Sequence, residues 1–350
     1  MSNDRQPSLL LKLVGLAAAV LVLVAVAGGS SLAVAEGEDR LQSCLQDAIL
    51  AAPDHMTAGE MRSRCQEKIV EHQRVAEPEA GGDAVEQRLA VDRANVLRPF
   101  TIMAHRQNYF LFGAYNFQGY SSREYILAFE DEDISVKNSE AQFQLSIKTP
   151  LATSLFDNDL DLYAGYTARS FWQVYHTDIS SPFRETNHEP EIWLQTHPGQ
   201  DIFGLELTTS IIGISHQSNG QSRNLSRSWN RIYGDFIFTR GNFALAFKPW
   251  IRLEEDFEDD DNPDITEYLG HGEIRLVYKH HDHTFSLMSR NSMESGFSKG
   301  AVEFGWSFPF FRYPYLKGYI QYFSGYGESL IDYNRYVSKI GIGVLFSDFL

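Results

Sequence analysis

From about residue 107 onward, apolar and polar residues alternate with a period of two, in segments of roughly ten residues. This period places successive side chains on opposite faces of a β-strand, whereas a helix repeats about every 3.6 residues. Glycine, aspartate and asparagine punctuate the gaps between segments, as turn residues do. The sequence predicts an all-β domain over 99–350 with twelve strands, in segments 108–116, 141–151, 160–175, 190–196, 201–211, 231–239, 242–253, 268–280, 283–291, 300–310, 314–327 and 336–349.

A soluble β-sandwich and a membrane barrel both contain many strands, so the strand count leaves the architecture open. Aromatic residues near the segment ends resemble the interfacial girdles of an outer-membrane barrel; they are Phe171, Trp172, Tyr175, Trp250, Tyr268, Tyr313, Tyr315, Tyr322 and Phe323. The last segment places Ile340, Ile342, Val344 and Phe346 on one parity, as a lipid-facing column would be. Together with the even strand number, these features favour a twelve-stranded antiparallel transmembrane β-barrel.

The N-terminal segment 1–35 has the order of a secretory signal peptide. Arg5 and Lys12 flank the start of an apolar run, and small residues of the Ala-x-Ala type end at Ala35, where we expect cleavage. A retained membrane helix is the alternative, and the acidic residues 36–39 argue against it. The mature chain is therefore expected to be exported.

Residues 36–98 show helical spacing in two stretches separated by Pro53. Cys44 and Cys65 lie one in each stretch, and an isolated pair in an oxidising compartment is expected to form a structural disulfide. We predict a small periplasmic helical hairpin, followed by a Pro/Gly/Glu-rich linker over 75–88. Recruitment of a periplasmic partner is a hypothesis that rests on this hairpin alone.

Length and charge narrow the function classes. The 350 residues suffice for two average domains or one large barrel. A formal net charge of −16 argues against binding to a phosphate backbone, and so against a nucleic-acid-binding protein. Downstream of Ala35 no window reaches the roughly 18 consecutive apolar residues of a membrane helix, which leaves an exported soluble protein or a β-barrel.

The polar stretch GISHQSNGQSRNLSRSWNRIYGDF, residues 213–236, is the candidate for chemistry. His216 and Ser218 are two residues apart, so in a strand they project from the same face. In an antiparallel register that places His216 opposite Asn230, Ser218 lies opposite Ser228, and such neighbours are about 5 Å apart at Cβ. Ser218, His216 and Asn230 can then converge as nucleophile, base and an amide that orients the base, as acyl transfer requires.

The parity of Asn230 places this cluster on the lipid side of a barrel. Even positions from Asn230 continue through Ile232, Gly234, Phe236 and Phe238, whereas odd positions are Arg231, Tyr233 and Asp235. The preceding strand must slip in phase near 210–211, most simply by a β-bulge. Unpaired polar groups that face lipid are costly, so the cluster makes physical sense if lipid is the substrate. The alternative is a plain polar loop, because His-x-Ser is a common combination.

Several motifs in order resemble outer-membrane phospholipase A over roughly 98–350: the stretch from His216 to Arg231, SSPFRETNHEPE (180–191), KPW (248–250), DDNPDIT (260–266) and FSGYGESLIDYN (323–334). The resemblance implies a twelve-stranded barrel in the outer membrane of a Gram-negative bacterium. It also implies hydrolysis of phospholipid and lysophospholipid acyl esters at either position, activation by calcium, and a homodimer as the active form.

Carried over by this resemblance, Ser218 is the nucleophile, His216 the base and Asn230 the orienting residue. The main-chain N–H groups of Ser218 and Gly220 form the oxyanion site, assisted by a calcium-bound water. The resemblance also implies that calcium, which prefers oxygen ligands, is held by Ser226, the carbonyl of Gln221 and, across the dimer, Ser180 of the facing protomer.

The chain departs from the family pattern at several positions. Arg223 stands where an acidic residue is frequent, which puts in doubt a second calcium site that would use Asp261. Ala168 replaces an amide at the dimer interface. Inward polar residues such as Glu206, Arg231 and Asp235 would permit a network that closes the lumen. A catalytically inactive pore or structural barrel remains the alternative function, and a polar triad beside lipid argues against it.

Overall fold

The computed structural model describes residues 84–96, 101–130, 133–157, 160–177, 182–256, 260–311, 313 and 315–350. The expected signal peptide (1–35) and the hairpin with Cys44 and Cys65 lie outside these residues. The chain divides into two compact units, one of 1–82 with 86–101 and one of 83–85 with 102–350. Helix α3 (Ala84–Val96) occupies part of the stretch where the sequence predicted a linker.

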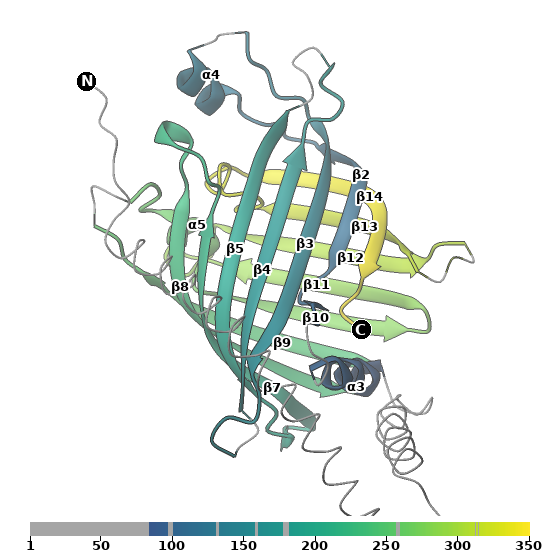
Figure 1. Cartoon of the computed structure of the whole chain (residues 1–350). Coiled ribbons are helices and arrows are strands. Elements are labelled where there is room, and N and C mark those ends of the chain that lie inside the picture. Colours follow the sequence, from purple (N-terminus) through teal and green to yellow (C-terminus); the bar gives the residue numbers. More distant parts are fainter. Residues whose placement is uncertain are drawn as a thin grey trace, which may run out of the picture. The chain divides into compact units, whose positions relative to one another are not determined.

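The second unit is a closed antiparallel β-barrel of twelve wall strands, and so confirms the predicted fold (Figure 1). Each strand pairs with its neighbours along the chain, while β14 pairs with β2 and closes the ring. The wall strands are β2 (Asn108–Asn116), β3 (Ser139–Ala152), β4 (Leu160–Trp172), β5 (Phe183–Thr196), β7 (Leu205–Ser218), β8 (Ser228–Arg240), β9 (Phe243–Leu253), β10 (Gly272–His280), β11 (His283–Asn291), β12 (Gly300–Pro309), β13 (Lys317–Gly325) and β14 (Val337–Ser347).

The connections between strands are long at one end of the barrel and mostly short at the other. The long end carries 117–138 with α4 (Arg123–Phe129), 173–182, 219–227 with η3 (Arg223–Leu225), 254–271 with α5 (Ile265–Leu269), 292–299 and 326–336. The opposite end carries 153–159 with η1 (Leu155–Asp157), 197–204, 241–242, 281–282 and 310–316. Among the described residues, no helix is long and apolar enough to cross a membrane.

Several strand boundaries differ from the sequence prediction. Strand β5 begins at Phe183 instead of 190, because its charged residues alternate into the lumen. The stretch 201–211 contains a tight turn at Phe203 and Gly204, both with positive φ, which joins the short β6 (Gln200–Ile202) to β7. The predicted strand 268–280 begins at 272, because α5 takes up residues 265–269.

Helix α5 forms in place of a strand because its apolar residues have helical spacing. Ile265 and Leu269 are four residues apart, so a helix buries both on one face, and they are 0% and 4% exposed. Gly270, with φ of 66°, ends the helix where a Cβ would clash with the main-chain carbonyl of Asn291.

Paired charges occupy much of the lumen, alongside buried apolar side chains. Arg169 on β4 and Arg275 on β10 both approach Glu303 on β12, each at 3.6 Å, so charges on well-separated strands pair across the lumen. Another ion pair joins Lys248 on β9 to Glu191 on β5 at 3.9 Å. The short β1 (Met103–Ala104) pairs with β3 and leads the chain toward this network.

Of the three polar residues that the sequence predicted to face the lumen, two do so. Arg231 is buried and Asp235 is largely buried, whereas Glu206 is exposed next to the β6–β7 turn. Glu206 lies before the phase slip in β7, so its parity does not carry over from the rest of the strand.

The outer face is apolar, but the aromatic girdle is smaller than the sequence predicted. Tyr175, Tyr313, Tyr315 and Tyr322 are exposed. By contrast, Phe171, Trp250 and Phe323 are at most 4% exposed and point into the barrel, because each occupies an inward position of its strand. In the last strand Ile340, Ile342 and Phe346 are exposed as a lipid-facing column, while Val344 is covered.

Candidate active site

The register of β7 and β8 brings the predicted residues together. His216 pairs with Asn230 and Ser218 pairs with Ser228, as the sequence predicted. The predicted β-bulge is present, with the register shift between Leu207 and Thr209, a little earlier than the expected 210–211. Beyond this bulge His216 and Ser218 share the outward parity of Ile212 and Ile214, which are 61% and 47% exposed. The cluster therefore lies on the outer face, at the long-loop end.

A chain of two hydrogen bonds runs from His216 through Asn230 to Glu255. His216 Nδ1 and Asn230 Oδ1 are 2.9 Å apart, and Asn230 Nδ2 donates to Glu255 Oε1 at 2.6 Å. Asn230 is 7% exposed, so its amide is held between these two partners. Burial raises the pKa of the Glu255 carboxyl, and the nearby charge of Asp260 raises it further.

Ser218 lies between two histidines on neighbouring strands. His216 is two residues away on β7, and His188 of β5 is its direct cross-strand partner. Tyr166 Oη lies 2.6 Å from His188 Nδ1, so that ring is already engaged. Within the described residues no hydrogen bond joins Ser218 to either imidazole. Such contacts are often long before substrate binds, so the relation of Ser218 to His216 rests on their shared face.

Inward residues fix the register from behind the site. Gln217 and Trp229 pair between the two outward pairs, and Trp229 Nε1 donates to Gln217 Oε1 at 2.7 Å. Trp229 is fully buried and stacks under the guanidinium of Arg231, whose Cζ lies 4.2 Å from the ring centroid. A one-residue slip would move His216 and Asn230 to the lumen, so this packing protects the site.

Asn219 organises the connection 219–227. Its side chain is 3% exposed; Nδ2 donates to the Leu225 carbonyl at 2.7 Å, and Oδ1 accepts from Arg227 N at 3.0 Å. Gly220 follows with φ of 63° and is exposed, because the chain must turn sharply directly after Ser218. The main chain at Ser218 and Gly220 therefore lies in a turn fixed by a buried amide.

Two of the predicted calcium ligands, Ser226 and Gln221, lie in the connection 219–227. Ser226 Oγ donates to Asp261 Oδ2 at 2.5 Å, and Gln221 is exposed in the same connection. Ser180 lies outside the described residues, as does the side chain of Arg223. No group of three or more His, Cys, Asp or Glu side chains suited to a metal occurs in the described part of the chain. A cation here would therefore rely on hydroxyl, carbonyl and single carboxylate oxygens.

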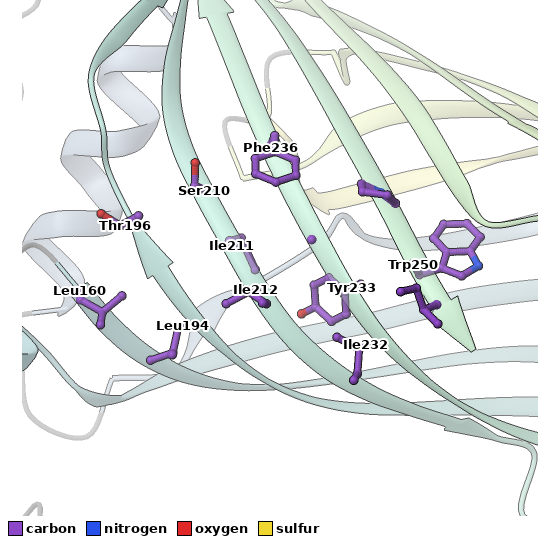
Figure 2. A pocket seen from close by; sticks show the side chains of 13 residues that line it. Leu160, Leu194, Thr196, Ser210, Ile211, Ile212, Ile232, Tyr233, Phe236 and Trp250 are labelled. Carbon is purple, nitrogen blue, oxygen red and sulfur yellow. The ribbon is translucent and has the colours of Figure 1, made fainter. Parts of the chain in front are cut away.

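An apolar groove of about 490 Å³ lies on the wall below the site, from β4 across to β9 (Figure 2). Ile212, Ile232 and Ile251 line it, and all three are exposed on the outer face. Gly234 contributes no side chain, and so leaves space on β8 four residues below Asn230. The groove thus begins one outward position below the polar cluster.

Three residues of the site escaped sequence reasoning: Glu255, Asn219 and His188. Glu255 stands within the acidic run 254–261, in which no single residue is distinguished. The same connection also supplies Asn262, whose Oδ1 accepts from Ser228 N at 3.0 Å. The motif DDNPDIT pointed to this region but gave no contact. His188 lay within another motif, and only the β5–β7 register places it beside Ser218.

Comparison with known proteins agrees with this geometry. A family model described as phospholipase A1 matches residues 85–346. Phospholipase A1 of Escherichia coli strain K12 is 36% identical over 259 residues, which cover 73% of this chain and 86% of that protein.

Two solved structures are similar to the chain at 34% identity, each with a TM-score of 0.66. One is the Salmonella typhi outer membrane phospholipase dimer with bound calcium, matched over 73% of this chain and 97% of that chain. The other is outer membrane phospholipase A from Escherichia coli carrying an asparagine-to-alanine active-site mutation, with the same coverage of both chains. With a closed barrel of the same kind and a family match over most of its length, the chain belongs to the phospholipase A1 family and is an outer-membrane phospholipase.

Proposed function

We propose that this protein hydrolyses acyl esters of phospholipids and lysophospholipids, at both the sn-1 and sn-2 positions, through Ser218, His216 and Asn230, and that it depends on calcium. The observation that carries the proposal is the hydrogen bond between His216 and Asn230 on the outer face. A barrel gains no stability from an imidazole and an amide placed beside lipid, so a lipid substrate supplies the reason for them.

The position of the cluster indicates which lipids it reaches. In outer-membrane barrels the long connections are extracellular and the short turns periplasmic. The cluster sits beside connection 219–227 at the long-loop end, which corresponds to the outer leaflet. The groove floored by Gly234 runs from it toward the membrane centre, and its apolar lining suits an acyl chain.

In this mechanism Ser218 Oγ attacks the ester carbonyl carbon and passes its proton to His216 Nε2. Asn230 Oδ1 holds Nδ1–H and so leaves Nε2 free to accept that proton. Main-chain N–H groups of Ser218 and Gly220 donate to the oxyanion. His216 then protonates the leaving alcohol, and water, deprotonated by the same ring, hydrolyses the acyl-enzyme.

The residues of this region fit a calcium ion. Ser226 Oγ and Asp261 Oδ2 lie 2.5 Å apart, and the exposed Gln221 lies in the same connection. Hard oxygen donors of this kind are what calcium prefers. Bound near Gly220, calcium would supply positive charge that stabilises the oxyanion. Asp261 is placed to contribute whether or not Arg223 weakens a second site.

We further propose a homodimer as the active form, in which Ser180 of each protomer completes the calcium site of the other. The solved Salmonella relative is a dimer with bound calcium, which supports this assembly. Ala168 pairs with Leu145 and His188 on the outer wall beside the site, so it lies on the face of the proposed contact without an amide to bridge it.

The test is fatty-acid release from mixed micelles by purified full-length protein, with calcium and then with a chelator. We expect turnover with calcium and its loss on chelation. Ser218→Ala should abolish turnover while the barrel stays folded, as judged by its electrophoretic mobility before heating. Fatty-acid release that persists in Ser218→Ala would refute the assignment of the nucleophile.

Turnover in neither condition would favour the inactive pore or structural barrel. The pore form of that alternative is disfavoured by the ion pairs of Arg169 and Arg275 with Glu303, which lie across the lumen. For the N-terminal region we propose a signal peptide ending at Ala35 and a periplasmic hairpin closed by Cys44 and Cys65. N-terminal sequencing and non-reducing electrophoresis of the mature protein test both.

A further inference from the structure

We propose that Glu255 is a positioning residue of the active site: its carboxylate locks the amide of Asn230 in the one orientation that makes His216 a base. This inference rests on the proposed function, and extends the set Ser218, His216, Asn230 by a fourth member. The hydrogen bond of Glu255 goes to Asn230, so its effect on the imidazole and the nucleophile passes through that amide.

The side-chain amide of asparagine is nearly symmetric in shape. Its oxygen and nitrogen are nearly equal in size, so the amide of Asn230 can flip unless its partners forbid one orientation. With Oδ1 toward His216, the ring carries its proton on Nδ1 and offers Nε2 to Ser218. With Nδ2 toward His216, the ring must accept at Nδ1 and carry its proton on Nε2, where it cannot take the proton of Ser218.

Glu255 removes this ambiguity because an ionised carboxylate can only accept hydrogen bonds. Its Oε1 lies 2.6 Å from Asn230 Nδ2, the short distance typical of a charge-assisted contact. A flip would turn Oδ1 toward the carboxylate and leave two acceptors facing each other. A histidine acting with a charged aspartate needs no such help, because a carboxylate can only accept. A neutral asparagine does need it.

The carboxylate also adds charge that the amide lacks. Polarised by Glu255, Asn230 presents a more negative oxygen to the imidazolium that forms when Ser218 attacks. The other charged groups that face Glu255 among the described residues are Asp260, Asp261 and Arg252. Arg252 Nη2 donates to both carboxylate oxygens of Asp260, at 2.6 and 2.7 Å, so these two charges largely offset each other. Glu255 lies in the connection after β9, outside the barrel wall, so replacing it leaves the strand pairing intact.

Variants of the full-length protein at position 255, assayed with calcium on mixed micelles, test this role. Glu255→Ala removes lock and charge, and should lower kcat about ten- to a hundred-fold with little change in KM, as for carboxylates that orient metal-binding imidazoles. Glu255→Gln can still accept from Asn230 but is neutral, so we expect a smaller loss. Its acid limb of kcat/KM should move about half a unit to lower pH, the effect of one screened charge.

The sharpest test reverses the hydrogen bond. Asn230→Asp alone places two carboxylates in contact and should be strongly impaired. In the double variant Asn230→Asp with Glu255→Gln, the glutamine amide donates to the new carboxylate at position 230, whose other oxygen faces His216. Activity should therefore recover at least tenfold over the single variant. Glu254→Gln is the matched control, because it removes the same charge from an exposed neighbour.

Wild-type kcat in Glu255→Ala, or a double variant no more active than Asn230→Asp, would overturn the role of Glu255. Neither result would touch the proposed function, which Ser218→Ala and chelation test separately. If wild-type protein itself is inactive on every micelle, the proposed function fails and this inference fails with it. Reaction with a serine-directed phosphonate probe gives a second readout, and its rate should fall in parallel with kcat.

Discussion

Polar side chains occupy both faces of the wall at β5, β7 and β8, and the two faces are built on different principles. On the inner face Glu189 accepts three hydrogen bonds from two arginines, Arg106 and Arg231, at 2.7 to 3.0 Å. On the outer face a chain of two hydrogen bonds joins His216, Asn230 and Glu255, beside the hydroxyl of Ser218. The inner charges compensate one another, whereas the outer chain of hydrogen bonds ends at the imidazole of His216, next to Ser218.

This difference teaches how to separate structure from function in a barrel that is polar inside. Buried charge in the lumen is expected whenever the barrel is too wide for an apolar filling, and it is tolerated where opposite charges pair with one another. Polar groups beside lipid have no such structural reason. A polar group on the lipid-facing side of the wall therefore indicates the active site more clearly than its residue type does.

The largest effect should come from replacing His216, and His188, the other histidine beside Ser218, provides the matched comparison. His216→Ala should lower kcat by at least about 10⁴, as loss of the base does in other serine hydrolases, without changing the unfolding midpoint. His188→Ala leaves the hydrogen bonds of His216, Asn230 and Glu255 intact, and its activity should stay within about tenfold of wild type. Fatty-acid release from micelles measures both variants. If His188→Ala were the more damaging, the base would be His188 with Tyr166 as its partner.

On the inner face a substitution should lower stability and leave activity nearly unchanged. Glu189→Gln leaves Arg231 without its carboxylate partner and Arg106 with Glu191 alone, and should lower the free energy of unfolding by about 3 kcal/mol. Activity below the transition should stay within a few-fold of wild type. Denaturant titration in detergent gives the stability, and Glu206→Gln on an exposed stretch of β7 is the control. A loss of kcat without a loss of stability would contradict the conclusion that the inner face serves stability and the outer face catalysis.

The smallest effect concerns the groove. Gly234→Leu fills it about 13 Å below Asn230, at roughly 3.3 Å per residue of strand. Hydrolysis of long-chain esters should fall about three- to tenfold relative to short-chain esters, since apolar contacts of this size are worth roughly 1 kcal/mol. A Cβ at Gly234 approaches the Phe236 ring at 3.1 Å, which that side chain can accommodate. Gly113→Leu, where a Cβ has open space on another strand, is the control; equal effects in both variants would mean that the groove does not hold the scissile chain.

Much of this site was predictable because strand geometry is regular. A period of two fixes which residues share a face, so the pairing of His216 with Asn230 followed from one assumed register. The need for a bulge in β7 followed from the switch in parity, although its position at Thr208 did not. The aromatic girdle was overestimated, because Phe171, Trp250 and Phe323 look the same in sequence whichever face they occupy.

The sequence by itself determined the barrel, its twelve strands and the outward position of Ser218, His216 and Asn230, because alternation along a strand is a local property. Only the tertiary structure decided what surrounds them. Glu255 reaches Asn230 from a connection 25 positions away, and His188 reaches Ser218 through the β5–β7 register. Such contacts depend on how loops fold over strand ends, where no periodicity constrains the chain.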